Sequence, residues 1–179
     1  MPTVEDEYLR VVQLNFEGLK SLGDKSLAQL KESDFHSQLD AEANSIAIII
    51  QHLHGNMLSR FTDFLTTDGE KPTRNRDNEF EPAALSQNQL LERWEAGWQV
   101  VMDTLASLTG CDLLRTIYIR NQPHTVLEAL NRQVAHYGAH VGQIILLAKH
   151  SKQADWKTLS IPKKGSKAFN QAMFGQKPI

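Results

Sequence analysis

Residues 86–108 read SQNQLLERWEAGWQVVMDTLASL, and their apolar side chains recur at steps of three and four residues. The recurring positions are Leu91, Trp94, Trp98, Val101, Leu105 and Leu108. This spacing places them on one face of a helix with 3.6 residues per turn. Ser86 is a suitable N-cap, and Thr109-Gly110 is a typical helix end. The stretch therefore predicts a helix whose apolar seam faces a core.

Three more stretches, residues 4–30, 42–64 and 126–149, have the same helical period. On the first, we expect one side to carry Tyr8, Val11, Val12, Asn15, Leu19 and Leu22. On the second, the stripe is Ile46, Ile50, Leu53, Met57, Phe61 and Phe64. Thr125 and Glu128 form a capping-box pattern at the start of the last stretch. We predict an all-α protein, a four-helix bundle forming a single domain over residues 1–179.

Two segments between these helices do not follow the helical pattern. Residues 66–82 (TTDGEKPTRNRDNEFEP) are too long for a tight helical hairpin, so they either cross the bundle or form a functional loop. Residues 113–120 (LLRTIYIR) contain β-branched and aromatic side chains and favour a short extended segment.

Composition excludes some classes of partner. The formal net charge of −2 argues against binding to nucleic acid or to an anionic membrane, and the acidic run at residues 77–81 (DNEFE) would repel phosphate. A basic tail covers about residues 151–179, which contain six lysines and a single acidic residue, Asp155. We interpret it as a solvated segment that docks on the bundle or on a partner chain.

The chain is expected to be cytoplasmic. Cys111 is the sole cysteine, so no intramolecular disulfide forms, in keeping with a reducing compartment. The first ten residues, MPTVEDEYLR, are acidic and lack the apolar centre of a signal peptide. No stretch reaches the roughly 20 apolar residues needed to cross a bilayer.

Three histidines are the candidate metal ligands. His136 and His140 lie one turn apart on the last predicted helix, so two imidazoles can reach one ion. His52 on residues 42–64 is the candidate third ligand. His54 is its rival, but the two point about 200° apart around the helix axis. Ser45 and Asn56 share the side of His52, and we expect either to orient its ring.

The alternative is that these histidines are hydrogen-bonded core residues without a metal. An HxxxH pair on a helix is a weaker signal than HExxH, because no glutamate adjoins His136 as a base. A third histidine on a second predicted helix strengthens the interpretation as a metal site.

The pair His52-Leu53, followed by HYGAHVGQI at residues 136–144, resembles the DinB superfamily, the DinB/YfiT-like metalloenzyme group. Residues 44–49, 55–71 and 160–170 resemble an uncharacterised, DinB-related domain-of-unknown-function branch. The resemblance implies a four-helix bundle with a long connection between its second and third helices. It also implies a divalent ion, usually zinc or nickel, held by His52, His136 and His140, and a homodimer.

Better-studied members of that group use the ion with low-molecular-weight thiols. Three neutral imidazoles leave the ion its full charge and an open position, where bound water or thiol loses its proton more easily. The leading hypothesis is a metal-dependent thiol S-transferase acting on a small molecule. A metal-dependent hydrolase, a non-enzymatic metal- or small-ligand-binding dimer and a purely structural bundle are the alternatives.

No catalytic residue is assigned from the sequence. Arg74 and Arg76 either bind an anionic substrate or pair with the acidic side chains at positions 77, 79 and 81. His124 is either an acid–base group or a surface histidine, and neither Glu128 nor Asp103 has a demonstrable place beside the ion.

Overall fold

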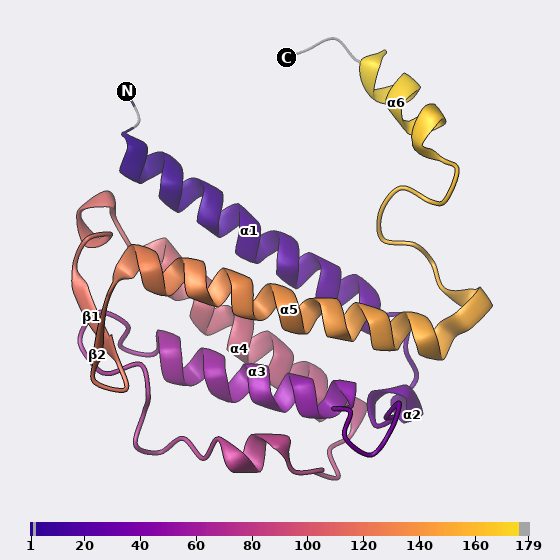
Figure 1. Ribbon diagram of the computed structural model, residues 1–179, viewed down its shortest axis with the longest axis horizontal. Helices are drawn as coiled ribbons and strands as arrows, with labels where there is room; N and C mark the ends of the chain where they lie inside the picture. The colour runs from indigo at the N-terminus through magenta and orange to yellow at the C-terminus, as the bar shows by residue number, and fades with distance from the viewer. Residues whose placement is uncertain (2, 176–179) are drawn as a thin grey trace.

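Four long helices make up about half of the protein (Figure 1). The computed structural model describes residues 1 and 3–175. The long helices are α1 (Val4–Leu27), α3 (Ile46–Phe61), α4 (Gln87–Ser107) and α5 (Val126–Lys152). Shorter pieces are α2 (Glu32–Phe35), α6 (Ser166–Phe174) and the 3-10 helices η1 (Asp77–Phe80), η2 (Gly110–Asp112) and η3 (Gln153–Asp155). The prediction of a mostly helical protein is confirmed.

The helix starts follow local capping chemistry. Thr125 Oγ1 accepts a hydrogen bond from the backbone of Glu128 (3.1 Å), and Glu128 Oε2 accepts one from the backbone of Thr125 (2.8 Å). Ser86 and Gln89 form the same reciprocal pair at the start of α4. These bonds satisfy amide groups that the first helical turn leaves without partners. The predicted capping box of α5 is confirmed.

A two-stranded antiparallel hairpin precedes α5. It joins β1 (Thr116–Ile119) to β2 (Gln122–Thr125), with Ile119 opposite Gln122. Arg120 and Asn121 form the turn with φ of 56° and 58°, the left-handed pair that matches the twist of a tight hairpin. The first strand lies within the predicted extended segment. The second was not predicted, because in QPHT Thr125 is the single residue with a strand preference and Pro123 disfavours a strand.

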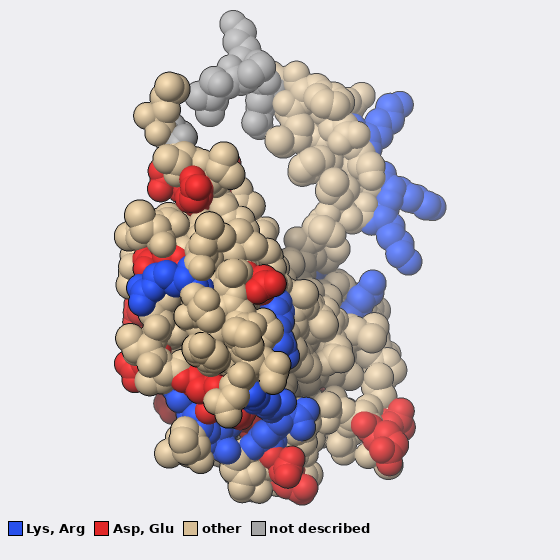
Figure 2. All heavy atoms as spheres, turned by 60° about the vertical axis from the view of Figure 1, so that its left-hand side comes forward, with Lys and Arg blue, Asp and Glu red and all other residues tan. Residues whose placement is uncertain are grey.

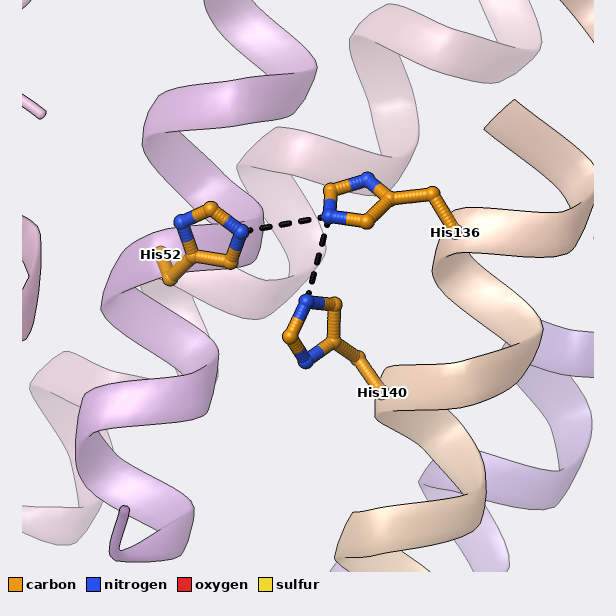
Figure 3. Close-up of side chains that lie close together, drawn as sticks. All are labelled: His52, His136 and His140. Atoms are coloured by element: carbon orange, nitrogen blue, oxygen red, sulfur yellow. Dashed lines mark hydrogen bonds between the residues drawn. The ribbon is translucent and has the colours of Figure 1, made fainter. Parts of the chain in front are cut away.

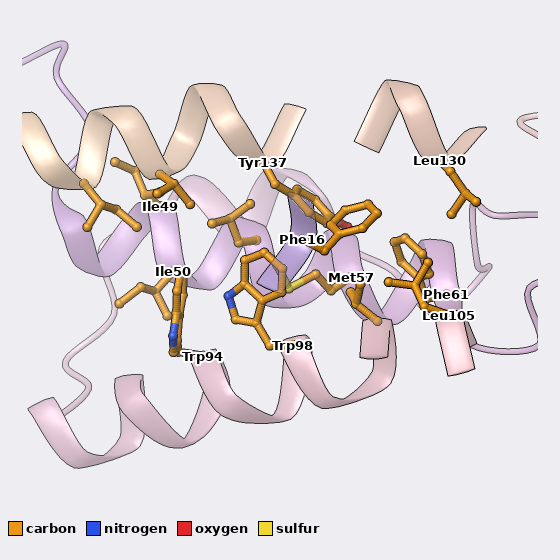
Figure 4. Packing of buried hydrophobic residues seen from close by; sticks show 14 of the residues in the cluster. Phe16, Ile49, Ile50, Met57, Phe61, Trp94, Trp98, Leu105, Leu130 and Tyr137 are labelled. Carbon is orange, nitrogen blue, oxygen red and sulfur yellow. The ribbon is translucent and has the colours of Figure 1, made fainter. Parts of the chain in front are cut away.

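The four long helices share one hydrophobic core (Figure 4). Phe16 of α1, Phe61 of α3, Trp98 of α4 and Tyr137 of α5 meet edge to face, with ring centroids 5.9 Å apart for Phe16 and Tyr137 and 5.7 Å for Trp98 and Tyr137. Such aromatic contacts add to the stabilisation from burial itself. One aromatic cluster therefore fixes all four helices relative to one another.

The buried side of α1 differs from the prediction. Val12 and Phe16 are buried, whereas Val11 is 41% exposed and Asn15 is exposed. Phe16 follows Val12 by one turn, so these two share a face, and Val11 and Asn15 lie about 100° to one side of it. The sequence pattern identified the helix and four of its inward residues, Tyr8, Val12, Leu19 and Leu22, but it wrongly included Val11 and Asn15 and missed Phe16.

The connection over residues 66–82 runs along α3 and carries η1 (Figure 1). Asp68 ties it to the hairpin, because its carboxylate accepts hydrogen bonds from the backbone N–H groups of Arg120 and Asn121, both at 2.8 Å. The backbone N–H of Gly69 donates to the carbonyl of Tyr118 (2.8 Å). The connection is thus a structured wall beside α3 rather than a crossing of the bundle.

The tail after α5 leaves the four-helix body and ends in α6 (Figure 1). Phe169, Met173 and Phe174 of α6 are exposed.

Within the described residues, no helix is both long enough and apolar enough to cross a membrane.

Two tryptophan variants separate hydrogen bonding from packing in the core. The indole Nε1 of Trp94 donates to Asp24 Oδ1 at 2.7 Å, whereas that of Trp98 has no acceptor among the described residues. Trp94→Phe and Trp98→Phe remove the same atoms. Because the bond to a carboxylate is lost only in the first, we expect Trp94→Phe to lower the free energy of unfolding by roughly 1 kcal/mol more in urea titrations. Equal losses would contradict this assignment.

Candidate metal centre

The imidazoles of His52, His136 and His140 converge between α3 and α5 (Figure 3). The Nε2 of His136 lies 3.3 Å from the Nε2 of His52 and 3.1 Å from that of His140. One nitrogen from each residue lies within 4.8 Å of the other two. The structure therefore brings together the three histidines that the sequence pattern selected.

Two helix faces with a four-residue spacing produce this convergence. On α3, His52, Asn56 and Arg60 follow one another at successive turns, and on α5 the same spacing relates Arg132, His136 and His140. All six side chains line one cavity of about 340 Å³. Residues four apart on a helix project to the same side, so each helix presents a polar stripe to its partner.

Glu79 fixes the proton of His52. Its Oε2 lies 2.9 Å from the Nδ1 of His52, and its two oxygens accept hydrogen bonds from Arg74 at 2.7 and 2.9 Å. Burial raises the pKa of the Glu79 carboxyl, but the bonds from Arg74 and His52 outweigh it and hold the pKa below its usual value. An ionised carboxylate only accepts, so Nδ1 of His52 carries the proton and Nε2 keeps a free lone pair.

The other two imidazoles, those of His136 and His140, are uncharged at neutral pH. The Nδ1 of His140 lies 3.0 Å from the amide oxygen of Gln143, which places the proton of His140 on Nδ1 as well. Burial lowers the pKa of His140, and repulsion from a protonated His52 would add to this effect. Burial, followed by repulsion from the protonated forms of His140 and His52, lowers the pKa of His136 to about 4. At neutral pH, His136 and His140 are therefore uncharged donors of electron pairs.

With three neutral rings, the protons of the cluster do not satisfy every Nε2 atom. The Nε2 atoms of His52 and His140 are both acceptors, and the Nε2 of His136 between them holds at most one proton. That proton satisfies one neighbour and leaves the Nε2 lone pair of the other without a donor. A divalent cation accepts all three lone pairs at once. Zinc–nitrogen bonds of tetrahedral geometry place the nitrogens about 3.3 Å apart, close to the two separations above. All three nitrogens lie within 4.8 Å of one another, and the pair from His52 and His140 would have to move closer to share one ion.

Gly55 allows Glu79 to reach His52. A Cβ atom at Gly55 would lie 2.7 Å from Cδ of Glu79, closer than real side chains approach. The predicted orienting partners of His52 were wrong. Ser45 instead caps α3 by accepting from Ile48 N, and Asn56 accepts from the hydroxyl of Tyr137 at 3.1 Å. The orienting group lies 27 positions away in a connection whose path no helical wheel predicts.

The remaining candidates lie elsewhere. His54 lines a separate cavity of about 560 Å³ on the other side of α3. Glu128 is used in the cap of α5, Asp103 accepts from Gln99 (2.7 Å), and His124 stands opposite Ile117 in the hairpin.

Of the two arginines considered in the connection, Arg74 takes the acidic partners and Arg76 contacts an aromatic ring. Arg74 pairs with Glu79 and contacts Glu70, whereas Arg76 lies over the ring of Phe80, 4.9 Å from its centroid. The ring of Phe80 in turn lies against His52, with centroids 4.7 Å apart. Arg60, Arg120 and Arg132 also line the cavity but were not singled out from the sequence. The four-residue spacing of Arg132 from His136 and of Arg60 from Asn56 was the signal available for two of them.

Fold and cluster together define a mostly helical protein with a three-histidine candidate metal centre. The sequence profile of a family described as "Protein of unknown function (DUF1572)" matches residues 3–165. The chain belongs to this family. A comparison with curated proteins finds no match.

Gly55→Ala tests how Glu79 orients His52. We expect the added methyl group to push Glu79 from α3, reducing the Nδ1–H tautomer of His52 in ¹⁵N NMR spectra and lowering the free energy of unfolding. Gly18→Ala is the matched control, because nothing lies within 4 Å of its added Cβ on exposed α1. That control should stabilise the protein by up to about 1 kcal/mol. An unchanged His52 tautomer in Gly55→Ala would refute the role of Glu79.

Proposed function

We propose that the protein is a divalent-metal-dependent enzyme of DinB-like four-helix-bundle type, with His52, His136 and His140 as ligands of zinc or nickel. The observation that carries the proposal is the convergence of three Nε2 atoms, two of them with their protons held on Nδ1. Ligand histidines commonly donate their second N–H to a carboxylate or carbonyl, which is the arrangement of His52 with Glu79 and of His140 with Gln143.

The proposed reaction is the transfer of a thiol sulfur to an electrophilic small molecule. When bound, the ion supplies a Lewis acid with an open position that favours ionisation of a thiol or water. Glu79 and Gln143 keep two ligand rings in the orientation required for binding. Phe80 covers His52 from the side of the connection and excludes water from that ring.

The lining of the cavity favours transfer over hydrolysis. Hydrolysis uses a positioned base to accept a proton from water, and carboxylates commonly serve in this role. No aspartate or glutamate of the described residues lines the cavity, and Glu79 is already bonded to Arg74 and His52. A thiol with a low pKa needs no such base once it is bound as thiolate.

Metal content in single variants tests the ligand set. We expect one zinc or nickel ion per chain in the wild type. His52→Ala, His136→Ala and His140→Ala should each lose it, while His54→Ala keeps it. Glu79→Gln should retain the fold and weaken binding roughly 10–100-fold, the usual effect of losing an outer hydrogen-bond partner. Elemental analysis and competition with a chromophoric chelator provide the measurements. Full metal content in any of the three ligand variants would contradict the ligand set.

Turnover by the metal-loaded protein tests the reaction class. We expect consumption of an electrophilic acceptor to require both the ion and an added thiol such as glutathione, and to stop when the ion is removed. Metal-dependent turnover without thiol would identify a hydrolase instead. Metal binding without turnover across thiols and acceptors would favour a binding protein.

We also infer that the chain forms a homodimer, as the DinB resemblance implies. The exposed apolar residues Phe169, Met173 and Phe174 of α6 support this inference. Light scattering should give twice the chain mass of 20.2 kDa. Met173→Ser combined with Phe174→Ser should shift it toward the monomer, and a monomeric wild type would contradict the inference.

A further inference from the structure

We propose that the histidine cavity binds the carboxylate or phosphate group of a small substrate through Arg76 and Arg132. This inference rests on the proposed function and adds to it a chemical class of substrate. Five guanidinium groups line the cavity, from Arg60, Arg74, Arg76, Arg120 and Arg132. Guanidinium groups match the two-oxygen edge of carboxylates and phosphates, so this lining is suited to an oxyanion.

Three of the five arginines already have acidic partners. Arg74 binds Glu79, and Arg60 and Arg120 bind Glu70 at 3.1 and 3.0 Å. Glu70 and Glu79 do not themselves line the cavity. The partners of these arginines therefore hold the wall together and leave the charge balance inside the cavity positive.

The other two, Arg76 and Arg132, make no ion pair with any residue that the structure describes. Arg76 is held by its contact with the ring of Phe80, and Phe80 by its contact with His52. Arg132 lies one helical turn before His136 on the same face of α5. The cavity is therefore lined by two guanidinium groups without an ion-pair partner among the described residues. Arg76 comes from the connection and Arg132 from α5.

Basic and acidic side chains are mixed on the face shown in Figure 2, and further basic side chains project at its right edge. On the face that the β1–β2 hairpin borders, lysine and arginine side chains concentrate in the lower part, next to acidic ones (Figure 2). The whole chain carries a formal charge of −2, and Asp77 and Glu81 beside the cavity are exposed. A long polyanion needs a broad basic surface, whereas a cavity of about 340 Å³ suits a small ligand. The acidic run at residues 77–81 does not shield the cavity from anions, because its buried member, Glu79, is neutralised by Arg74.

Charge balance couples the anion to the metal. A divalent cation placed beside five guanidinium groups is repelled by them, and Glu70 and Glu79 offset only part of that charge. A bound oxyanion offsets more of it. The metal and the anion should therefore each raise the affinity for the other by the same factor, about tenfold, as linkage requires.

The test titrates succinate, inorganic phosphate and neutral succinamide into the full-length protein by calorimetry, with and without bound zinc. We expect succinate or phosphate to bind, the preferred one revealing which oxyanion the site takes, and succinamide not to bind. Arg76→Gln and Arg132→Gln should each weaken binding about tenfold, the usual effect of losing one charged hydrogen-bond donor. Arg10→Gln is the control, since Arg10 pairs with Glu7 on exposed α1 and does not line the cavity.

The outcomes separate this inference from the proposed function. Arginine-dependent binding of either anion, unchanged in Arg10→Gln, supports the oxyanion site. Zinc binding with no affinity for either anion overturns the site and leaves the metal centre standing. Arginine-dependent anion binding in a protein that takes up no zinc or nickel keeps the site and overturns the metal-dependent function. Equal weakening by Arg10→Gln would show that binding follows net charge and would overturn the site.

Discussion

The contact between Glu79 and Nδ1 of His52 is the interaction on which the candidate site depends. It fixes the proton on one side of the imidazole, which leaves the lone pair on the side facing His136. The pair of Glu79 and Arg74 is largely withdrawn from water, with side chains 9% and 3% exposed. Breaking such a pair leaves a buried charge uncompensated, so the connection, α3 and the histidine cluster form one unit.

The packing of the helices sets the positions of the residues in this unit. Asn56 lies one turn from His52 and accepts a hydrogen bond from Tyr137, which neighbours His136 on α5. The ring of Tyr137 belongs to the aromatic cluster that joins all four long helices. Because the core sets the spacing of α3 and α5, it also sets the distance between the His52 ring and the other two. The site is therefore as rigid as the core beneath it.

The arrangement combines two kinds of charge recognition in one cavity. Lone pairs from three histidines point toward one place, and guanidinium groups surround it. The proposed cation would accept the lone pairs, and the proposed anion would pair with Arg76 and Arg132. A substrate that carries an acid group and reacts at a bound ion would satisfy both.

The long helices and the three histidines could be predicted because the apolar residues of the sequence recur with the helical period. The four long helices follow from apolar spacing, and the three histidines follow from their positions on two of them. Because His52 and His54 point to different sides of one helix, only one of them could face the site, and the polar side chains of Ser45 and Asn56 favoured His52. Two residues of α1, Val11 and Asn15, were wrongly placed inward because they lie beside the stripe that contains Val12 and Phe16.

The parts that the sequence did not predict depend on irregular backbone. Glu79 reaches His52 only because residues 66–82 fold back along α3, and Gly55 leaves room for it. The second strand of the hairpin depends on the turn at Arg120 and Asn121 rather than on strand-forming residues. Long connections have no period from which their path can be calculated.

X-ray absorption spectroscopy of the zinc-loaded protein tests the central claim most directly. The account predicts three imidazole nitrogens at about 2.0–2.1 Å from the ion, with the outer-shell scattering that rigid imidazole rings produce. A first shell of oxygen atoms, or one with fewer than three imidazoles, would contradict it.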